Sequence, residues 1–162
     1  AGAEVELINT KFREKTLREK INLIENKYDF IMVDCPPSLG LLSLNALTAS
    51  NTVLIPIQCE YYSLEGVGQL IDTVKLVKKN LNPKLEIEGV ILNMFDGRTN
   101  LSIQVVEEVK KYFKDKVYRT VIPRSIRLAE APSFGQPIML YDDKSKGSIA
   151  YIKLSEEFIK NN

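Results

Sequence analysis

The sequence predicts an α/β fold in which a mostly parallel sheet is flanked by helices. Four near-continuous apolar runs have the length of strands, at residues 30–34, 52–57, 87–95 and 117–123. Runs of this kind, without alternating polar residues, are typical of parallel strands that are covered on both faces. Helical patterns separate the runs, and the alternation favours a parallel sheet wrapped by helices. Because 44% of the 162 residues are hydrophobic, we expect residues 1–162 to bury one core as a single domain.

Four segments carry the spacing of helices. Thr16 followed by Glu19 resembles a capping box and predicts a helix with a buried stripe that continues to Ile24. Apolar residues at intervals of three and four predict helices within 67–77 and 102–113, and a terminal helix around 151–158. Residues 131–147 hold two prolines and two glycines, which predicts a surface loop before the last helix.

The composition excludes several kinds of site. Basic and acidic residues number 22 and 21, so binding of nucleic acid or anionic lipid needs a local patch. Histidine is absent, which removes Ser-His-Asp and Cys-His catalysis and every histidine metal site. Cys35 and Cys59 lack the close spacing of a redox or zinc motif, so we expect small buried side chains in a reducing cytoplasm. No apolar run approaches the ~20 residues that span a bilayer, and the start at Ala1 suggests part of a longer polypeptide.

The run 30–34 ends on a carboxylate, Asp34, and two prolines follow. In open parallel sheets, ligands bind beyond the carboxyl ends of the strands, where Asp34 is expected. An apolar strand that ends in aspartate is the Walker B pattern, whose carboxylate holds Mg²⁺ beside a nucleotide phosphate. Pro36 and Pro37 force the chain out of the sheet as a stiff loop, which suits a phosphate-sensing switch. The pattern is also compatible with a strand that ends in proline and an aspartate that caps the next helix.

Four blocks together resemble one family. They are DCPPSLGLLSLNAL, IPIQCEYYSLEGVGQL, NMFDGRTNLS and VYRTVIPRSIRLAEAPSFGQPI, in this order along the chain. The chain thereby resembles the ParA/Soj family of chromosome- and plasmid-partition ATPases, from about its first residues to its final helix. MinD-type ATPases are close relatives of that family, but the EYYSLEG and IPRSIRLAEAPSFG blocks are more similar to the Soj branch. The fold implied is that of a P-loop NTPase.

The resemblance implies roles for individual residues on the nucleotide side. Asp34, Pro36 and Pro37 match the switch II region, in which the aspartate holds magnesium through water. Asn93 and Pro123 match the positions that hold the adenine base. Both fall at the carboxyl ends of predicted strands, although without the family Asn93 is more simply a polar cap on a strand end. The implied cofactors are ATP and magnesium.

The resemblance also implies a DNA-binding face. Arg98 and Arg127 match arginines that the family uses for sequence-independent DNA binding by its ATP-bound dimer. Arg124 lies between them and can serve either the nucleotide or the DNA. Guanidinium groups suit phosphate contacts, which weaken steeply with salt. From composition alone, arginines in loops are usually solvated surface, so this role depends on the resemblance.

As a member of the family, the parent protein is expected to segregate DNA. ATP would drive homodimerisation, the dimer would bind nucleoid DNA, and a ParB-type centromere-binding protein would stimulate hydrolysis and release. The implied location is cytoplasmic and nucleoid-associated, without a membrane partner. Two alternatives are a MinD-like membrane-cycling regulator of division and a non-enzymatic DNA-binding fragment. Glu156 and Glu157 in the final segment favour a helix packed on the domain over a membrane-inserting one.

The sequence departs from the family at the phosphate-handling segments. None of its eight glycines is followed by lysine, so the Walker A loop with its lysine is not in this sequence. We therefore expect the chain to correspond to the carboxyl-terminal two-thirds of such an ATPase and to show no appreciable ATP hydrolysis alone. The family's P-loop strand lies beside the Walker B strand, so we also expect unpaired edges next to 30–34 and a rearranged sheet. An iron–sulfur role for the cysteines is not expected.

Overall fold

A computed structural model describes residues 2–36 and 38–162. The chain divides into two compact units, each described here by itself. Unit 1 comprises the amino-terminal residues up to Val53 together with Gly68–Ile87, and unit 2 comprises Leu54–Val67 and Glu88–Asn162. The expectation of a single domain stays a prediction.

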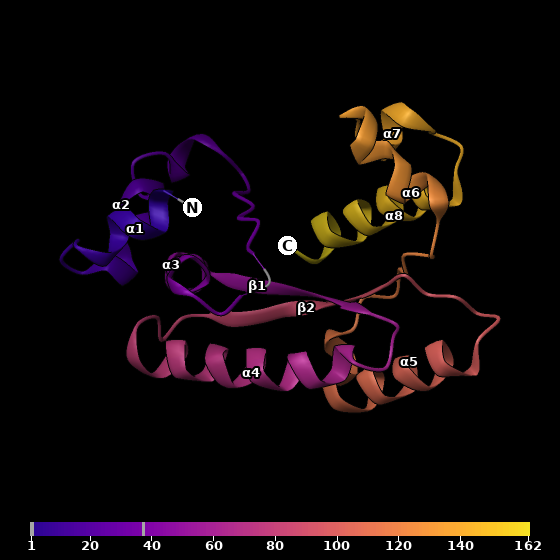
Figure 1. Ribbon diagram of the computed structural model, residues 1–162, viewed down its shortest axis with the longest axis horizontal. Helices are drawn as coiled ribbons and strands as arrows, with labels where there is room; N and C mark the ends of the chain where they lie inside the picture. Colours follow the sequence, from indigo (N-terminus) through magenta and orange to yellow (C-terminus); the bar gives the residue numbers. More distant parts are fainter. Residues whose placement is uncertain (1, 37) are drawn as a thin grey trace. The chain divides into compact units, whose positions relative to one another are not determined.

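The helices and strands alternate along much of the chain (Figure 1). The strands are β1 (Thr52–Gln58) and β2 (Glu86–Asn93). The helices are α1 (Gly2–Ile8), α2 (Thr16–Ile21), α3 (Leu41–Ala49), α4 (Ser63–Asn80), α5 (Asn100–Phe113), α6 (Ile126–Glu130), α7 (Ile138–Tyr141) and α8 (Lys146–Asn161). Single 3₁₀ turns occur at Arg13–Lys15, Glu25–Lys27, Lys114–Lys116 and Ala131–Phe134. The predicted runs 52–57 and 87–95 and the predicted helices around 67–77, 102–113 and 151–158 are confirmed as elements.

The fold is α/β, with a parallel sheet flanked by helices, as the sequence predicts. β1 pairs with β2, and isolated parallel bridges join Val90 to Val117 and Phe95 to Pro123. The predicted strand 117–123 therefore pairs with the β2 segment only near its two ends. The prediction of a continuous strand is wrong because the backbone N–H groups of Arg119 and Thr120 bond to a side chain instead of to β2.

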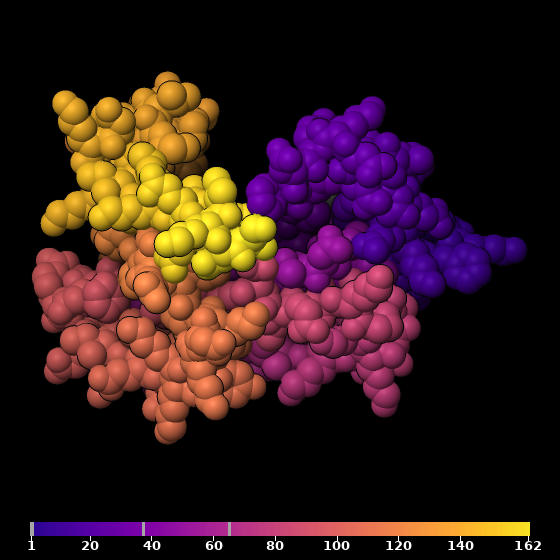
Figure 2. Space-filling model, turned by 180° about the vertical axis from the view of Figure 1, so that it is seen from behind, coloured from indigo at the N-terminus to yellow at the C-terminus, as the bar shows by residue number. Residues whose placement is uncertain are grey.

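In unit 2, α5 and α8 lie on opposite sides of the strands (Figure 1). Ile91, Tyr118, Ile122 and Leu154 form a buried cluster between β2 and α8. The ring of Tyr118 crosses the backbone at Gly89 so closely that a Cβ there would lie 2.4 Å from its Cε2 atom. Figure 2 shows α8, in yellow, at the surface of the molecule beside other carboxyl-terminal segments. α8 is thus a helix packed on its unit, as its sequence predicts.

Unit 1 has its own core, formed by Leu47 of α3, Val74 and Val77 of α4, and Leu85. Six of the nine residues of α3 are apolar, and Ser43 and Asn45–Ala49 are buried. One asparagine, Asn82, satisfies backbone groups in this core, since buried polar groups need partners. The Asn82 side chain donates to the carbonyls of Leu47 (3.1 Å) and Ser50 (2.7 Å).

The run 30–34 is the main error of the sequence prediction. It was expected as a buried strand, but it is irregular and exposed, with Met32 at 70% of its full accessibility. Among the described residues no strand pairs with it. An extended segment becomes a strand only when a neighbour accepts and donates its backbone hydrogen bonds, and apolar side chains cannot replace that neighbour.

Three smaller expectations also need correction. The capping box at Thr16 is not formed: Lys15 is the N-cap, without a side-chain bond, because α2 already includes Thr16. The predicted loop 131–147 contains a 3₁₀ turn and α7, joined through Gly135, whose φ of 63° suits a residue without Cβ. Cys59 is buried as expected, but Cys35 is exposed, since it follows the run 30–34, which is not part of the sheet.

Candidate functional site

The ends of the parallel strands in unit 2 bring the predicted base-binding residues together. At the end of β1, the Cys59 amide donates to the Asn93 carbonyl at 2.9 Å. On the other side, the Phe95 amide donates to the Ile122 carbonyl at 3.0 Å, and the Arg124 amide donates to the Phe95 carbonyl at 2.9 Å. Pro123 lies opposite Phe95 in this ladder, where its missing N–H is not needed. Asn93, Pro123 and Arg124 therefore share one edge of unit 2.

The Asn93 side chain is oriented by its own backbone. Its Oδ1 atom accepts the amide of Met94 at 2.8 Å, and Met94 adopts a left-handed conformation with φ of 54°. Such a conformation is uncommon for a residue with a side chain and turns the chain sharply after β2. The amide oxygen has a second lone pair and the amide nitrogen is a donor, a pair that matches the N6 and N7 edge of adenine. The arrangement fits an adenine base chemically.

Two acidic residues beside this edge escaped the sequence analysis. Arg124 forms an ion pair with Glu60, two residues beyond the end of β1. Arg124 also lies near Asp96 and contributes to the low pKa of that carboxyl. No local sequence pattern predicts these partners, because Glu60 and Arg124 are 64 residues apart. The guanidinium of Arg124 is thereby held at the strand ends.

Arg98 forms hydrogen bonds and an ion pair with Asp96, two residues earlier in the chain. The Oδ1 atom of Asp96 accepts the Arg98 amide at 3.1 Å and its Nε at 2.9 Å, while Oδ2 accepts Nη2 at 2.7 Å. These bonds hold the pKa of Asp96 well below its usual range and raise the pKa of Arg98. The Arg98 side chain remains 88% exposed, so its charge faces solvent although it is paired.

Arg127, on α6, is also paired. Its Nη1 atom lies 3.0 Å from Oε2 of Glu130, and its Nε atom lies 3.4 Å from Oδ2 of Asp142. The hydrogen bond to Glu130, more than any other interaction, raises the pKa of Arg127. Both arginines expected to contact DNA are therefore exposed and accompanied by carboxylates, a feature that the sequence did not reveal.

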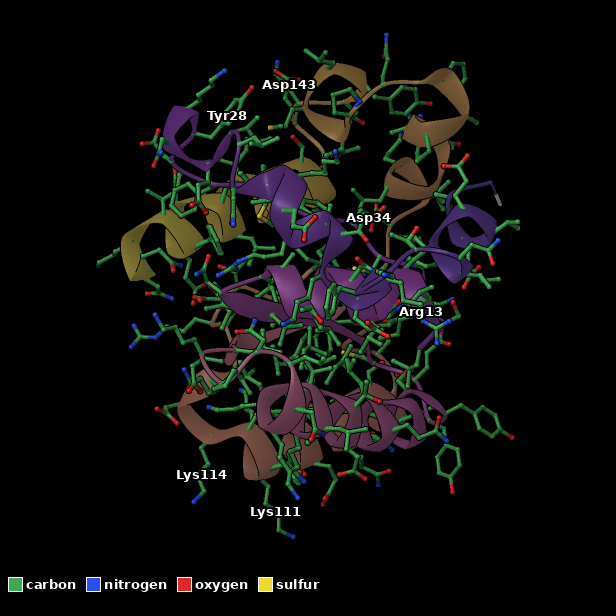
Figure 3. All side chains as sticks on the ribbon, turned by 90° about the vertical axis from the view of Figure 1, so that its left-hand side faces the viewer. Arg13, Tyr28, Asp34, Lys111, Lys114 and Asp143 are labelled. Atoms are coloured by element: carbon green, nitrogen blue, oxygen red, sulfur yellow. The ribbon has the colours of Figure 1, made fainter. Side chains whose placement is uncertain are left out.

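Asp34 and Pro36 lie in unit 1, and Pro37 lies outside the described residues. Asp34, labelled in Figure 3, is on the irregular exposed run. With Val33, Cys35 and Pro36 it borders a pocket of ≈ 460 Å³, whose other walls come from α1, α2 and α3. Within residues 2–36 and 38–162, no three His, Cys, Asp or Glu side chains are grouped as a metal site requires. One carboxylate that holds magnesium through water needs no such group, so the metal role of Asp34 stays a prediction.

Comparisons with known proteins identify the relatives of the chain. The family model of the AAA domain matches residues 1–87. Sporulation initiation inhibitor protein Soj of Bacillus subtilis is 60% identical over 161 residues, which are 99% of this chain and 64% of Soj. Chromosome partitioning protein ParA of Myxococcus xanthus is 57% identical over 98% of this chain and 56% of that protein. The chain thus spans about two-thirds or less of the curated relatives it matches.

Solved structures agree with the fold. Cobyrinic acid a,c-diamide synthase from Mycobacterium smegmatis with bound ATP analogue and magnesium is 34% identical, with a TM-score of 0.77 over 96% of this chain and 56% of the synthase. The septum site-determining protein MinD of Pyrococcus horikoshii, complexed with Mg-ADP, is 31% identical, with a TM-score of 0.70 over 89% of this chain and 56% of MinD. Homologous structures therefore hold adenine nucleotides with magnesium.

Proposed function

Because the chain belongs to the AAA-domain family, and within it to the ParA/Soj chromosome-partitioning ATPases, we propose that it is the base-binding and DNA-contacting portion of a DNA-segregation ATPase. The observation that carries the proposal is the 60% identity to Soj over nearly the whole chain. In the proposed cycle, ATP and magnesium drive homodimerisation and the dimer binds DNA non-specifically. A ParB-type partner then stimulates hydrolysis and release in the cytoplasm at the nucleoid.

For the nucleotide, the proposed residues are Asn93, Pro123 and Arg124. Their common position at the strand ends, and the oriented amide of Asn93, support a site for the adenine base. Asp34 is proposed as the magnesium carboxylate, with Pro36 and Pro37 in the switch that follows it. The phosphate cradle is not in this sequence, so we expect the chain alone to hold the base without hydrolysing ATP.

Calorimetric titration of the 162-residue chain with ATP and Mg²⁺ tests the nucleotide role. We expect weak binding that an Asn93→Ala variant loses, because the side-chain amide supplies the contacts to the base. An Asn80→Ala variant is the matched control, since Asn80 is exposed on α4 and bonds only within its helix. Equal heats for Asn93→Ala and the unaltered chain would contradict the base site. Tight binding that depends on magnesium would contradict the view that the phosphate site is missing.

For DNA, the proposed residues are Arg98 and Arg127. Both guanidinium groups are exposed, which supports contact with phosphates. Each arginine that contacts a phosphate should contribute about one unit to the slope of affinity against salt. Fluorescence anisotropy with a random-sequence duplex measures this slope for Arg98→Ala and Arg127→Ala. Lys111→Ala is the control, because Lys111 points away from α5 into solvent (Figure 3), and a loss of the same size there would indicate bulk charge only.

A MinD-like membrane function is the second candidate, because MinD structures share the fold at 30–31% identity. The identity to Soj is about twice as high, and this favours DNA as the partner. Within the part of the chain that the structure describes, no helix is long and apolar enough to cross a membrane. Sedimentation with anionic liposomes separates the candidates: binding to liposomes and not to duplex DNA would favour the MinD-like function. DNA binding that persists without ATP would instead indicate a non-enzymatic module.

A further inference from the structure

Residues 117–123 run parallel to β2 and pair with it near both ends. Between the paired ends, residues 119–121 leave the ladder, and we call them the excursion. The Tyr118 amide donates to the Val90 carbonyl and the Ile122 amide donates to the Leu92 carbonyl, both at 2.9 Å. The two acceptors are two residues apart along β2, whereas the two donors are four residues apart. In a regular parallel ladder both spacings are equal. The segment therefore carries two additional residues at this point.

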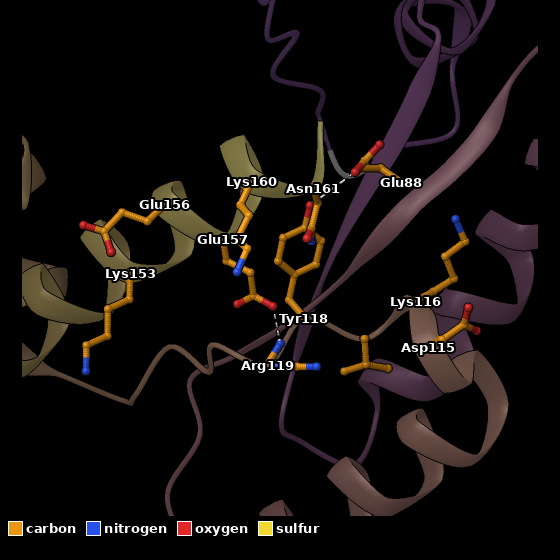
Figure 4. A pocket seen from close by; sticks show the side chains of 11 residues that line it. Glu88, Asp115, Lys116, Tyr118, Arg119, Lys153, Glu156, Glu157, Lys160 and Asn161 are labelled. Atoms are coloured by element: carbon orange, nitrogen blue, oxygen red, sulfur yellow. Dashed lines mark hydrogen bonds between the residues drawn. The ribbon is translucent and has the colours of Figure 1, made fainter.

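Glu157 of α8 binds the backbone of this excursion. Its Oε1 atom accepts the amide of Arg119 at 2.7 Å (Figure 4). Its Oε2 atom accepts the amide of Thr120 at 2.9 Å. Successive N–H groups of an extended strand point to opposite sides, so one carboxylate reaches both only where the backbone leaves the strand. One side chain thus satisfies the N–H groups of Arg119 and Thr120, neither of which bonds to β2.

The position of the carboxylate is fixed by the packing of α8. Leu154, one turn earlier, is buried against Ile91 and Ile122. At the end of the helix, the Asn162 side chain and the Tyr118 hydroxyl both donate to Oε1 of Glu88. Glu157 therefore faces the excursion from a helix that is anchored on either side of it.

The excursion determines which residues reach the end of the strand. Beyond it, Pro123 lies opposite Phe95 and the Arg124 amide bonds to the Phe95 carbonyl. A strand advances about 3.3 Å per residue, so if the two additional residues joined the ladder, Pro123 and Arg124 would move about 6.6 Å further along β2. A shift of this size exceeds the length of a hydrogen bond twofold. Pro123 and Arg124 therefore stay beside Asn93 only while residues 119–121 remain outside the ladder.

We propose that Glu157 is a positioning residue of the nucleotide-base site, because its carboxylate holds residues 119–121 out of the strand and so places Pro123 and Arg124. The proposal rests on the proposed base-binding function of those residues. Glu157 contacts no nucleotide itself. It links the carboxyl-terminal helix to the base edge through the backbone of one strand.

The Glu157→Gln variant tests this role with almost no change in size. The amide oxygen of Gln accepts one N–H, but its NH₂ group meets the second N–H donor to donor. Glu156→Gln is the matched control, because it removes the same charge from the same turn of α8, and Glu156 is exposed. The assay is a titration of the ¹⁵N-labelled 162-residue chain with adenosine, followed by NMR at the amides of Phe95 and Arg124. Hydrogen exchange at the amides of Arg119 and Thr120 is measured in parallel.

We expect Glu157→Gln to weaken adenosine binding by about tenfold and to accelerate exchange by a similar factor at the amide that loses its acceptor, as for loss of a hydrogen bond to a charged group. Glu156→Gln should change neither quantity. A folded Glu157→Gln variant that binds adenosine like the unaltered chain overturns the positioning role and leaves the proposed function intact. Absence of saturable binding by the unaltered chain at millimolar adenosine contradicts the base site itself, and the positioning role with it. If Glu157→Gln does not fold, Glu157→Asp decides, because its carboxylate is withdrawn by one methylene: unchanged affinity overturns the role.

Discussion

The crossing of Tyr118 over Gly89 gives the sharpest test of the structure. In Gly89→Ala the new Cβ would lie 2.4 Å and 2.8 Å from two ring carbons of Tyr118 and 2.9 Å from the Lys116 carbonyl oxygen. The ring is buried and the carbonyl is backbone, so neither can move away freely. Overpacking of a buried site by one methyl group costs about 1–3 kcal/mol. We expect the free energy of unfolding to fall by this amount, measured as a lower urea midpoint at an unchanged slope.

Gly68→Ala is the matched control, because it is the same substitution in the middle of α4. Nothing lies within 4 Å of a Cβ at Gly68. Alanine in a helix interior is more stable than glycine by about 0.5–1 kcal/mol, so this variant should raise the urea midpoint. Opposite signs are expected for the two variants. A Gly89→Ala protein as stable as the unaltered chain would show that Tyr118 does not cross the strand here.

Three further predictions follow from the hydrogen bonds. Asn82→Ala removes the donor to the Leu47 and Ser50 carbonyls, the first of them in a buried hydrogen bond, and should lower the free energy of unfolding by about 2 kcal/mol. Asn80→Ala should change it by less than about 0.5 kcal/mol, and urea unfolding of both variants checks this. Asp96→Asn removes the carboxylate that pairs with Arg98 and should strengthen duplex binding by about two- to fivefold in the anisotropy assay, and weaker binding would contradict it. Burial favours a raised pKa for Glu157, but the hydrogen bonds from Thr120 and Arg119 outweigh it and the pKa is lowered. The stabilisation is therefore complete above the ordinary glutamate value of about 4.3 and is lost as pH falls through the lowered pKa, so the difference in Tm between the unaltered chain and Glu157→Gln should shrink in acid, and a constant difference would refute it.

Local patterns predicted the elements whose partners lie in the same pattern. The apolar stripe of 67–77 and that of 102–113 identify α4 and α5, because one buried face at helical spacing specifies both the period and the side that packs. The run 52–57 gives β1, with Ile55 and Ile57 buried. The placement of Asn93 and Pro123 at strand ends also followed from sequence, since the carboxyl edge of a parallel sheet gathers the ends of its strands.

Contacts between distant residues were beyond those patterns. Nothing in VYRTVIP indicates an excursion, because its cause is Glu157, 37 and 38 residues away along the chain. The carboxylates beside Arg124 and Arg127 were missed for a similar reason: a charged residue in a loop has the same local signature with or without a partner. The family resemblance identified the arginines as candidate binding residues, but only the structure shows their acidic partners.

The runs 30–34 and 52–57 show how far composition alone determines burial. Both are apolar and of similar length, yet Ile55 and Ile57 are almost fully buried while Met32 is largely exposed. The difference is β2, which accepts hydrogen bonds along one run and not along the other. The same difference decides the chemistry of Asp34, because a carboxylate at a strand end is aimed by the strand that carries it. A magnesium role for Asp34 therefore requires that 30–34 be held in a sheet, and chemistry at Asp34 depends on the backbone partner of that run more than on the aspartate itself.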